Sequence, residues 1–287
     1  MTLFFRQLRG ELVKLFARKR TWMGFGAFIV LEIVILILLQ SHKVQERFRV
    51  GFERNGAVQG LNAMFDDYFR GFTLALLIVM LTVFLLGGLF LALVGGDIVS
   101  KEVEDGTLRM SLCRPISRFR LLAVKYVTAI IYTFALVFFI AGTALLVGVV
   151  WRGLGGLFAF IPEEQLFAIY ETGEGAVRFS VALAFYATAL CAITSLAFMV
   201  SCFNVKPAAA TIVTLTVFLT DRILYMWPQF ADYRSWFMSA HINSWINIFR
   251  DPIPWSQITE DYLYLLGVNA TFVIVGMAMF CRRDFKS

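Results

Sequence analysis

The fold class is decided by residues 72–96, which read FTLALLIVMLTVFLLGGLFLALVGG and contain no charged side chain. An α-helix rises about 1.5 Å per residue, so a run of this length can cross a hydrocarbon core of about 30 Å. In water the same helix would expose apolar surface on every side, because no polar face interrupts the run. The stretch therefore predicts a membrane-spanning helix.

Five further runs have the same character. Together with the first they predict six spans, at residues 22–40, 72–96, 121–151, 176–203, 207–227 and 262–281. The chain of 287 residues is 59% hydrophobic and only 16% charged, whereas a soluble domain averages about 25% charged residues. We therefore predict an all-α polytopic membrane protein, in which residues 22–287 form one six-helix transmembrane domain.

The distribution of lysine and arginine predicts the orientation. The N-terminal segment, the loop after the second span, Lys206 and the C-terminal tail together carry sixteen of these residues, and the opposite side carries nine. Cytoplasmic loops of membrane proteins are enriched in lysine and arginine. Both termini are therefore expected in the cytoplasm. The net charge is +6, and the basic residues lie beside apolar runs, where they set the topology and attract anionic lipid. No nucleic-acid partner is therefore expected.

Three segments outside the spans are predicted to lie at the membrane surface. In residues 1–21, apolar side chains recur at helical spacing and predict an amphipathic helix on the cytoplasmic surface: Phe4, Phe5, Leu8, Leu12, Leu15 and Phe16. In the first outer loop, residues 61–69 repeat such a pattern. The outer segment 228–261 is dense in aromatic residues and predicts one or two short helices. It is interpreted either as an aromatic belt or as a gate.

The loop at residues 97–120 has the most specific pattern, DIVSKEVEDGTLRMSLCRPISRFR. A short acidic helix is expected to stop at Gly106, and the chain breaks again at Pro115. Ser117 can then cap the third span. Fixed breaks with alternating charge favour a rigid element held against a protein partner; the alternative is a solvated basic loop.

These residues resemble the signature of the ABC type-2 permease family, which reads Glu-x-x-x-Gly-Thr-Leu, then Leu-x-x-Pro-x-Ser-Arg, then a lysine in the next helix. The matching residues are Glu102, Gly106, Thr107, Leu108, Leu112, Pro115, Ser117, Arg118 and Lys125. The N-terminal Glu11-Leu-Val-Lys14-Leu is similar to the family's amphipathic first helix. Cys113-Arg114 departs from the family pattern, which more often has small or apolar residues there.

The resemblance implies the permease subunit of an ATP-driven exporter in a bacterial inner membrane. Two permease subunits, identical or different, would assemble with two copies of an ABC ATPase. The loop at 97–120 would couple the ATPase to the membrane helices through these residues: Glu102, Glu104, Gly106, Thr107, Arg114, Pro115, Ser117 and Arg118. The sequence has no phosphate-binding Gly-x-x-x-x-Gly-Lys-Ser/Thr loop, so ATP and magnesium are expected in the partner ATPase and no cofactor in this chain.

Two alternatives stay open. Within the resemblance, the chain would be a non-transporting transmitter that passes ATP-driven motion to an envelope or periplasmic partner. From another class, it would be a structural or enzymatic membrane protein without an ATPase. No spacing of cysteine or histidine predicts a metal site, and no combination of serine, histidine and carboxylate predicts a catalytic one.

Polar residues inside the predicted spans are further candidates. Glu32 lies near the middle of the first span, where a carboxylate costs about 2.5–3.5 kcal/mol, so it should face protein or water. Asp221 and Arg222 lie near the outer end of the fifth span, and both are expected to reach outward. In the second span, Gly88 and Gly96 belong to a row of small residues that permits close helix approach.

Overall fold

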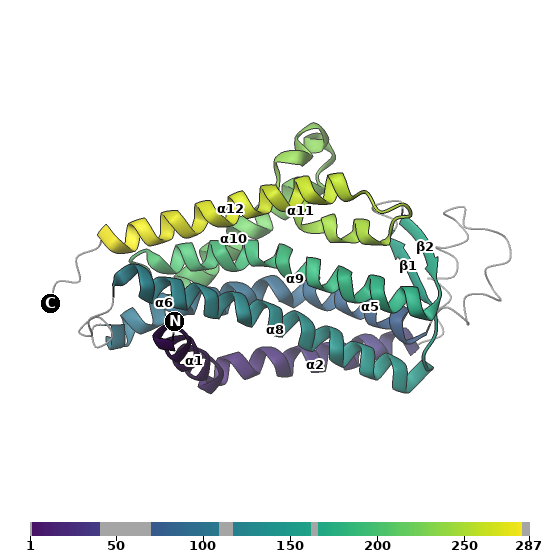
Figure 1. Cartoon of the computed structure of the whole chain (residues 1–287), viewed down its shortest axis with the longest axis horizontal. Helices are drawn as coiled ribbons and strands as arrows, with labels where there is room; N and C mark the ends of the chain where they lie inside the picture. The colour runs from purple at the N-terminus through teal and green to yellow at the C-terminus, as the bar shows by residue number, and fades with distance from the viewer. Residues whose placement is uncertain (1, 41–69, 109–116, 162–165, 283–287) are drawn as a thin grey trace.

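The computed structural model describes residues 2–40, 70–108, 117–161 and 166–282 as a bundle of long helices with a small hairpin at one end (Figure 1). The predicted spans correspond to α2 (Lys19–Gln40), α5 (Gly71–Thr82) with α6 (Gly88–Glu104), α8 (Arg118–Arg152), α9 (Thr172–Cys202), α10 (Pro207–Met226) and α12 (Trp255–Arg282). Within the described residues, all of these except α5 and α6 are long and apolar enough to cross a membrane, which makes five. The prediction of a mainly helical, multi-pass membrane protein is confirmed to that extent.

The second predicted span is divided. A π-helical turn, η1 (Val83–Gly87), joins α5 to α6 without a break in the helical chain. A π turn holds one more residue than an α turn and is rare outside such single insertions. As a result, neither apolar half is long enough on its own to count as a span.

The centre of the bundle is α9. It packs against α6, α8, α10 and α12. In its most apolar stretch of 18 residues, 78% of the residues are buried. The corresponding fraction is 11% in α10 and 17% in α12, although both helices are apolar. The outward faces of α10 and α12 therefore require lipid or another protein chain as their environment.

Glycines allow α6 to approach its neighbours closely. A Cβ atom at Gly88 would lie 2.9 Å from the ring of Phe218, and one at Gly96 would lie 3.2 Å from the backbone nitrogen of Thr211. Both neighbours belong to α10. The predicted packing role of this row of small residues is confirmed, and its partner is α10.

A two-stranded antiparallel hairpin, which the sequence analysis did not predict, follows α8. Its strands are β1 (Leu157–Ile161) and β2 (Leu166–Tyr170), with Leu157 opposite Tyr170. The backbone nitrogen of Phe158 donates to Thr73 Oγ1 at 2.8 Å, which attaches the hairpin to the beginning of α5. The hairpin thus closes one end of the bundle (Figure 1).

The outer aromatic segment forms three short pieces: η3 (Pro228–Trp236), α11 (Met238–Ile242) and η4 (Asn243–Phe249). η3 has no buried side chain and projects from the bundle (Figure 1). By contrast, Trp245 is buried and stacks on Tyr186 of α9 at a ring distance of 4.4 Å. The prediction that these rings gather at the membrane surface is therefore wrong for Trp245, which belongs to the protein core.

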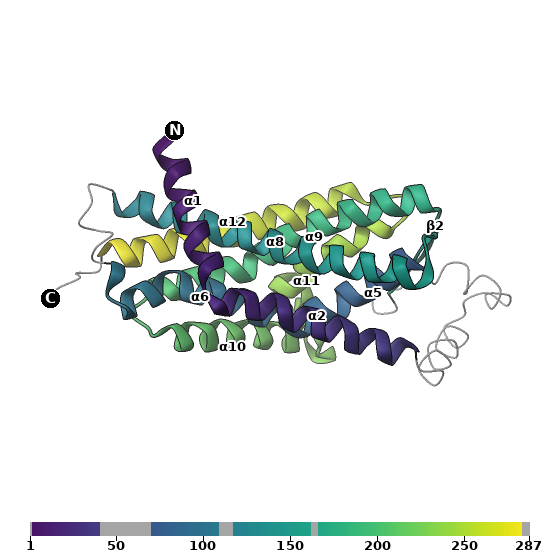
Figure 2. The ribbon, with the colours of Figure 1, turned by 90° about the horizontal axis from the view of Figure 1, so that it is seen from below.

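The remaining helix, α1 (Thr2–Ala17), lies at the end of the bundle opposite the hairpin. The end of α6, the beginning of α8 and the last turns of α12 lie at this same end (Figure 1). Figure 2 shows that α1 turns away from the direction of α2 and crosses the end of the bundle. The amphipathic pattern predicted for residues 61–69 lies outside the described residues.

Candidate coupling site

Three helices meet at a buried lysine. Lys125 Nζ, on α8, donates to Glu11 Oε2 on α1 at 2.9 Å and contacts Glu102 Oε1 on α6 at 2.8 Å. A third contact, at 3.3 Å, is to the carbonyl oxygen of Ile98. An ammonium group has three protons to donate, and here each has an acceptor. The Lys125 side chain is only 1% exposed, so this group joins α1, α6 and α8 in the interior.

A second lysine balances the charge of the cluster. Lys14 Nζ lies 2.7 Å from Glu11 Oε1 and 3.7 Å from Glu102 Oε1. Two ammonium groups therefore face two carboxylates, which offsets the cost of removing these charges from water. Among the described residues, Glu102 Oε2 is buried without a hydrogen-bond partner. The glutamate of α6 is thus held by one oxygen only.

The ionisation of α1 reflects these contacts. Burial raises the pKa of Glu11, but the charges and hydrogen bonds of Lys125 and Lys14 outweigh burial and leave the pKa below its usual value. Burial lowers the pKa of Lys14, but the hydrogen bond and charge of Glu11 and the charge of Glu102 leave it above its usual value. Both groups are therefore charged at neutral pH.

Glu11, Lys14 and Lys125 belong to the sequence motif, but the motif alone did not predict that they form a site. Glu11 lies three residues after Leu8 and four before Leu15, so it falls on the apolar stripe of α1. An acid in an apolar stripe needs a buried partner. That position was the available signal, although nothing in the sequence identifies Lys125 as the partner.

An exposed acidic turn follows Glu102. α6 ends at Glu104, and Gly106 has a φ of +70°, a conformation that favours glycine. The predicted stop at Gly106 is confirmed, but the acidic segment is the last turn of α6 and not a separate helix. Lys101 Nζ, one turn earlier on α6, stabilises this acidic turn: it lies 2.8 Å from Glu104 Oε2 and 3.1 Å from Asp105 Oδ1.

Glu102 and Glu104 therefore have different positions. The side chain of Glu102 is 6% exposed and faces Lys125, whereas that of Glu104 is 43% exposed. A partner protein can contact Glu104 directly, but it can reach Glu102 only through the turn. A coupling role for Glu102 stays a prediction. Because Glu102 is buried, it could act only by holding the acidic turn in place.

Of the other predicted coupling residues, Thr107 contacts the end of α6, and Ser117 and Arg118 lie at the beginning of α8. Thr107 Oγ1 lies 3.4 Å from the carbonyl oxygen of Glu102. Ser117 Oγ accepts from the backbone nitrogen of Arg120 at 3.3 Å, which confirms the predicted helix cap. Arg118 Nη1 donates to the carbonyl oxygen of Cys281 at 3.1 Å and so joins α8 to the end of α12. The other two, Arg114 and Pro115, lie outside the described residues.

A further ion pair lies beside the cluster. Arg20 Nη1, on α2, lies 3.2 Å from Asp97 Oδ2 on α6, and the Asp97 side chain is 7% exposed. The end of α6 is therefore tied to α1, α2 and α8 by charged groups. The Lys125, Glu102 and Asp97 side chains at these contacts are buried, whereas Arg20 is 59% exposed.

The intramembrane acid Glu32 is buried, as expected. Its side chain faces Thr143 of α8, whose Oγ1 lies 2.9 Å from Glu32 Oε1. This contact joins α2 to α8 at mid-helix. Within the described part of the chain, no group of three or more histidine, cysteine, aspartate or glutamate residues is placed to hold a metal ion.

Asp221 and Arg222 both bond residues of the aromatic segment that follows α10. Asp221 accepts from the backbone nitrogens of Met238 at 3.0 Å and Ser239 at 2.8 Å, so it caps α11. Arg222 Nη1 donates to Asn243 Oδ1 at 3.1 Å. Both side chains hold the outer segment against α10.

Comparisons with known proteins place the chain in a family. Residues 33–286 match a family described as "Protein of unknown function (DUF2705)". The chain belongs to this DUF2705 family. The match includes α5, α6 and α8, with Glu102 and Lys125, but it begins after α1, so Glu11 and Lys14 lie outside it.

A relative of this DUF2705 member occurs in Bacillus subtilis (strain 168), where it is called "Uncharacterized protein YhcI". The two sequences are 24% identical over 211 residues, which cover 71% of this chain and 66% of the relative. The chain thus spans about two thirds of the length of YhcI. Neither name states an activity.

Proposed function

We propose that this chain is the permease subunit of an ABC exporter in a bacterial inner membrane, driven by a separate ATPase through residues 97–120. The observation that carries the proposal is the buried cluster at Lys125. It joins an exposed acidic turn to three helices of the bundle. A subunit that is moved by a partner needs a contact surface with rigid connections behind it, and these residues supply both.

The proposed topology has six crossings, with α5, η1 and α6 together forming the sixth. Residues 71–104 are helical throughout, and at about 1.5 Å per residue this length exceeds the roughly 30 Å hydrocarbon core. The basic residues of α1, of the end of α6, of the beginning of α8 and of the end of α12 share one end of the bundle (Figure 1). That end is proposed to be cytoplasmic.

The partners follow from the exposed surfaces. The acidic turn at Glu104 would contact one of two ABC ATPase copies, which would bind ATP and magnesium. The apolar outward faces of α10 and α12 would contact lipid and a second permease subunit, identical or different. This chain would carry no catalytic residue of its own. A transmitter that acts on an envelope partner would use the same surfaces. Only the exporter would move a substrate across the membrane, so transport of a substrate distinguishes the exporter from the transmitter.

Co-expression with an ABC ATPase, taken first from the genes next to this one if such a gene is found there, tests the proposal. The full chain should co-purify with the ATPase in detergent or nanodiscs and should change its rate of ATP hydrolysis. Glu104→Lys should weaken both effects, because a reversed charge at a protein contact typically costs several kcal/mol.

The matched control is Glu260→Lys, since Glu260 is also exposed but lies near the beginning of α12, far along the chain from the acidic turn. This variant should behave like the parent. Failure of the chain to bind any such ATPase, or equal behaviour of the two variants, would favour the structural or enzymatic alternative.

A further inference from the structure

His241 lies between the projecting helix η3 and the first turns of α12, and both of its ring nitrogens face oxygen acceptors. Nδ1 is 2.7 Å from Asp261 Oδ1, and Nε2 is 2.9 Å from the carbonyl oxygen of Ser235. A carbonyl oxygen has no proton to give, so Nε2 must be the donor in its contact. The His241 side chain is only 12% exposed, so water cannot readily substitute for these partners.

The proton between His241 and Asp261 belongs to the imidazole. Asp261 Oδ2 already accepts from Ser244 Oγ at 2.5 Å, as expected of a carboxylate. In water an aspartic acid (pKa about 3.9) is a much stronger acid than an imidazolium (pKa about 6.5). Nδ1 therefore also carries a proton, and the ring is an imidazolium.

The surroundings of the ring favour a positive charge. Burial lowers the pKa of His241, but the hydrogen bonds to Asp261 and to the Ser235 carbonyl, together with the charges of Asp261 and Asp221, leave the pKa above its usual value. The ring also stacks on Tyr264 at a distance of 3.9 Å. An aromatic face attracts a cation placed over it.

The nearby cations are engaged with other groups. The charged residues on the packed elements are Asp221 and Arg222 on α10, Asp232 and Arg234 on η3, Glu174 and Arg178 on α9, and Glu260, Asp261 and, at its far end, Arg282 on α12. Arg222 bonds Asn243, and Arg234 lies over the ring of Tyr225. Arg178 donates to the carbonyl oxygens of Ile248 and Arg250. The charges that act most strongly on His241 are therefore carboxylates.

η3 depends on few contacts of this kind. None of its side chains is buried. Its last two residues are held by the contact from His241 to Ser235 and by a hydrogen bond from Tyr264 Oη to the carbonyl oxygen of Trp236, at 3.1 Å. We propose that the proton on His241 latches η3 onto α12, and that loss of this proton releases η3.

The number of N–H groups on the His241 ring determines which contact is lost. A neutral imidazole has one N–H but would still face two acceptors, Asp261 and Ser235. A bond to a carboxylate is roughly twice as strong as one to a neutral carbonyl, so the single N–H stays on Nδ1. Nε2 then presents a lone pair to the Ser235 carbonyl, which repels it. The outer aromatic segment therefore responds to pH at one residue.

The protonation state can be measured directly, because the chain has only two histidines, His42 and His241. A His42→Gln variant, labelled with ¹⁵N and ¹³C in histidine and placed in nanodiscs, gives one ring signal by NMR. The midpoint at which the ring loses its second proton should lie above the usual value of about 6.5. Asp261→Asn should lower the midpoint. A midpoint at or below the usual value would overturn the proposal.

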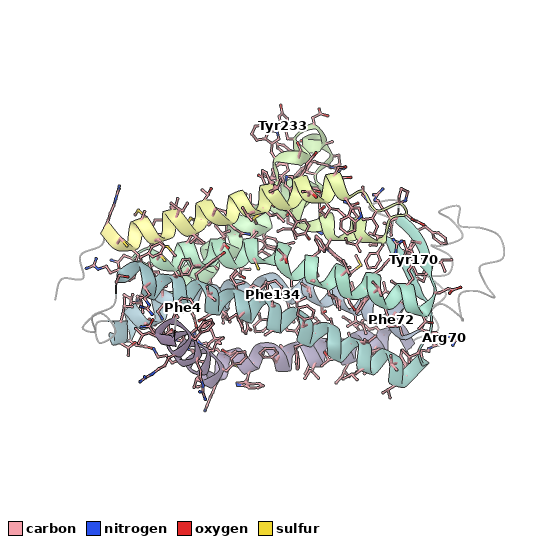
Figure 3. The ribbon with its side chains drawn as sticks, in the orientation of Figure 1. Phe4, Arg70, Phe72, Phe134, Tyr170 and Tyr233 are labelled. Atoms are coloured by element: carbon pink, nitrogen blue, oxygen red, sulfur yellow. The ribbon has the colours of Figure 1, made fainter. Side chains whose placement is uncertain are left out.

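Release of η3 needs a second measurement. Tyr233 lies at the tip of the projecting segment and is 60% exposed (Figure 3). A spin label on Tyr233→Cys, with the native cysteines replaced, should lose its immobilised component as the pH rises through the His241 midpoint. A label on Trp255→Cys should show no such change, since it lies at the beginning of α12. A His241→Gln variant should show no transition at Tyr233. A pH-independent label in the parent, or the same transition in His241→Gln, would contradict the latch.

Discussion

Replacing Lys125 with methionine is the most direct test of the buried cluster. Methionine matches the length of the lysine stem but leaves Glu11 and Glu102 to share Lys14, which is 54% exposed and lies 3.7 Å from Glu102. Breaking a buried pair by removing one partner typically costs about 3–5 kcal/mol. One kcal/mol shifts the melting temperature of a chain of roughly this size by about 2–4 °C, so we expect a decrease of about 6–20 °C.

The assay is thermal unfolding of the purified full chain in one detergent, with a triple variant as control. In Glu11→Gln, Glu102→Gln, Lys125→Met, no buried charge is left without a partner. Lys14 loses both carboxylates, but its side chain is 54% exposed and stays in contact with water. Replacing a whole buried ion network with neutral groups is often close to neutral in stability. The triple variant should therefore melt above the single variant. If Lys125→Met melts with the parent, or the triple variant melts lowest, the cluster does not stabilise the fold in this way.

The pH dependence gives an independent check on the same variant. In the parent, the pKa of Glu11 lies below its usual value, so its contribution is present above the usual carboxyl range and is lost as the pH falls through the folded pKa. In Lys125→Met, carboxylates without a full partner gain stability when they take up protons. The difference between parent and variant should therefore shrink as the pH falls from 7 to 4.

The remaining predictions concern single positions. Gly106→Ala should cost about 1–2 kcal/mol because φ is positive there, whereas Gly10→Ala, in the open middle of α1, should gain about 0.5–1 kcal/mol; thermal unfolding compares the two. An impermeant thiol reagent added to intact cells should label Glu171→Cys but not Ser117→Cys, and the reverse pattern would invert the topology. Glu32→Gln should shift the melting temperature by less than about 2 °C, because the amide keeps its buried hydrogen bond, so a large loss would mean that the acid itself is required.

The long helices were predictable because each is encoded by a continuous apolar run. The run at residues 207–227 matches α10 (Pro207–Met226) within one residue, since Pro207 marks the beginning. The span predicted at 262–281 omitted the first seven residues of α12, Trp255–Asp261. These residues are mostly polar and precede the apolar stretch. An apolar run shows which residues can lie inside a membrane, but it does not show where the helix begins or ends outside the membrane.

The site was predictable only in part. Gly106 and Ser117 have local signals, a left-handed glycine and a helix cap, and both were found. The contact between Glu11 and Lys125 joins residues 114 positions apart, and no local pattern encodes that distance. The hairpin at 157–170 was missed for another reason: its strands are five residues each, too short for an alternating pattern to stand out.

The π turn at Val83–Gly87 has a consequence for how one helix serves different neighbours. Each residue of an α-helix advances the side-chain direction by about 100°, so one inserted residue rotates everything after it by that angle. Before the turn, α5 packs mainly against α8; after it, α6 packs mainly against α9 and α10. Deleting one residue from this turn would restore regular geometry but would aim Gly88 and Gly96 away from α10. The inserted residue thus turns the half that bears the acidic turn toward α9 and α10, while the half beside the hairpin packs mainly against α8.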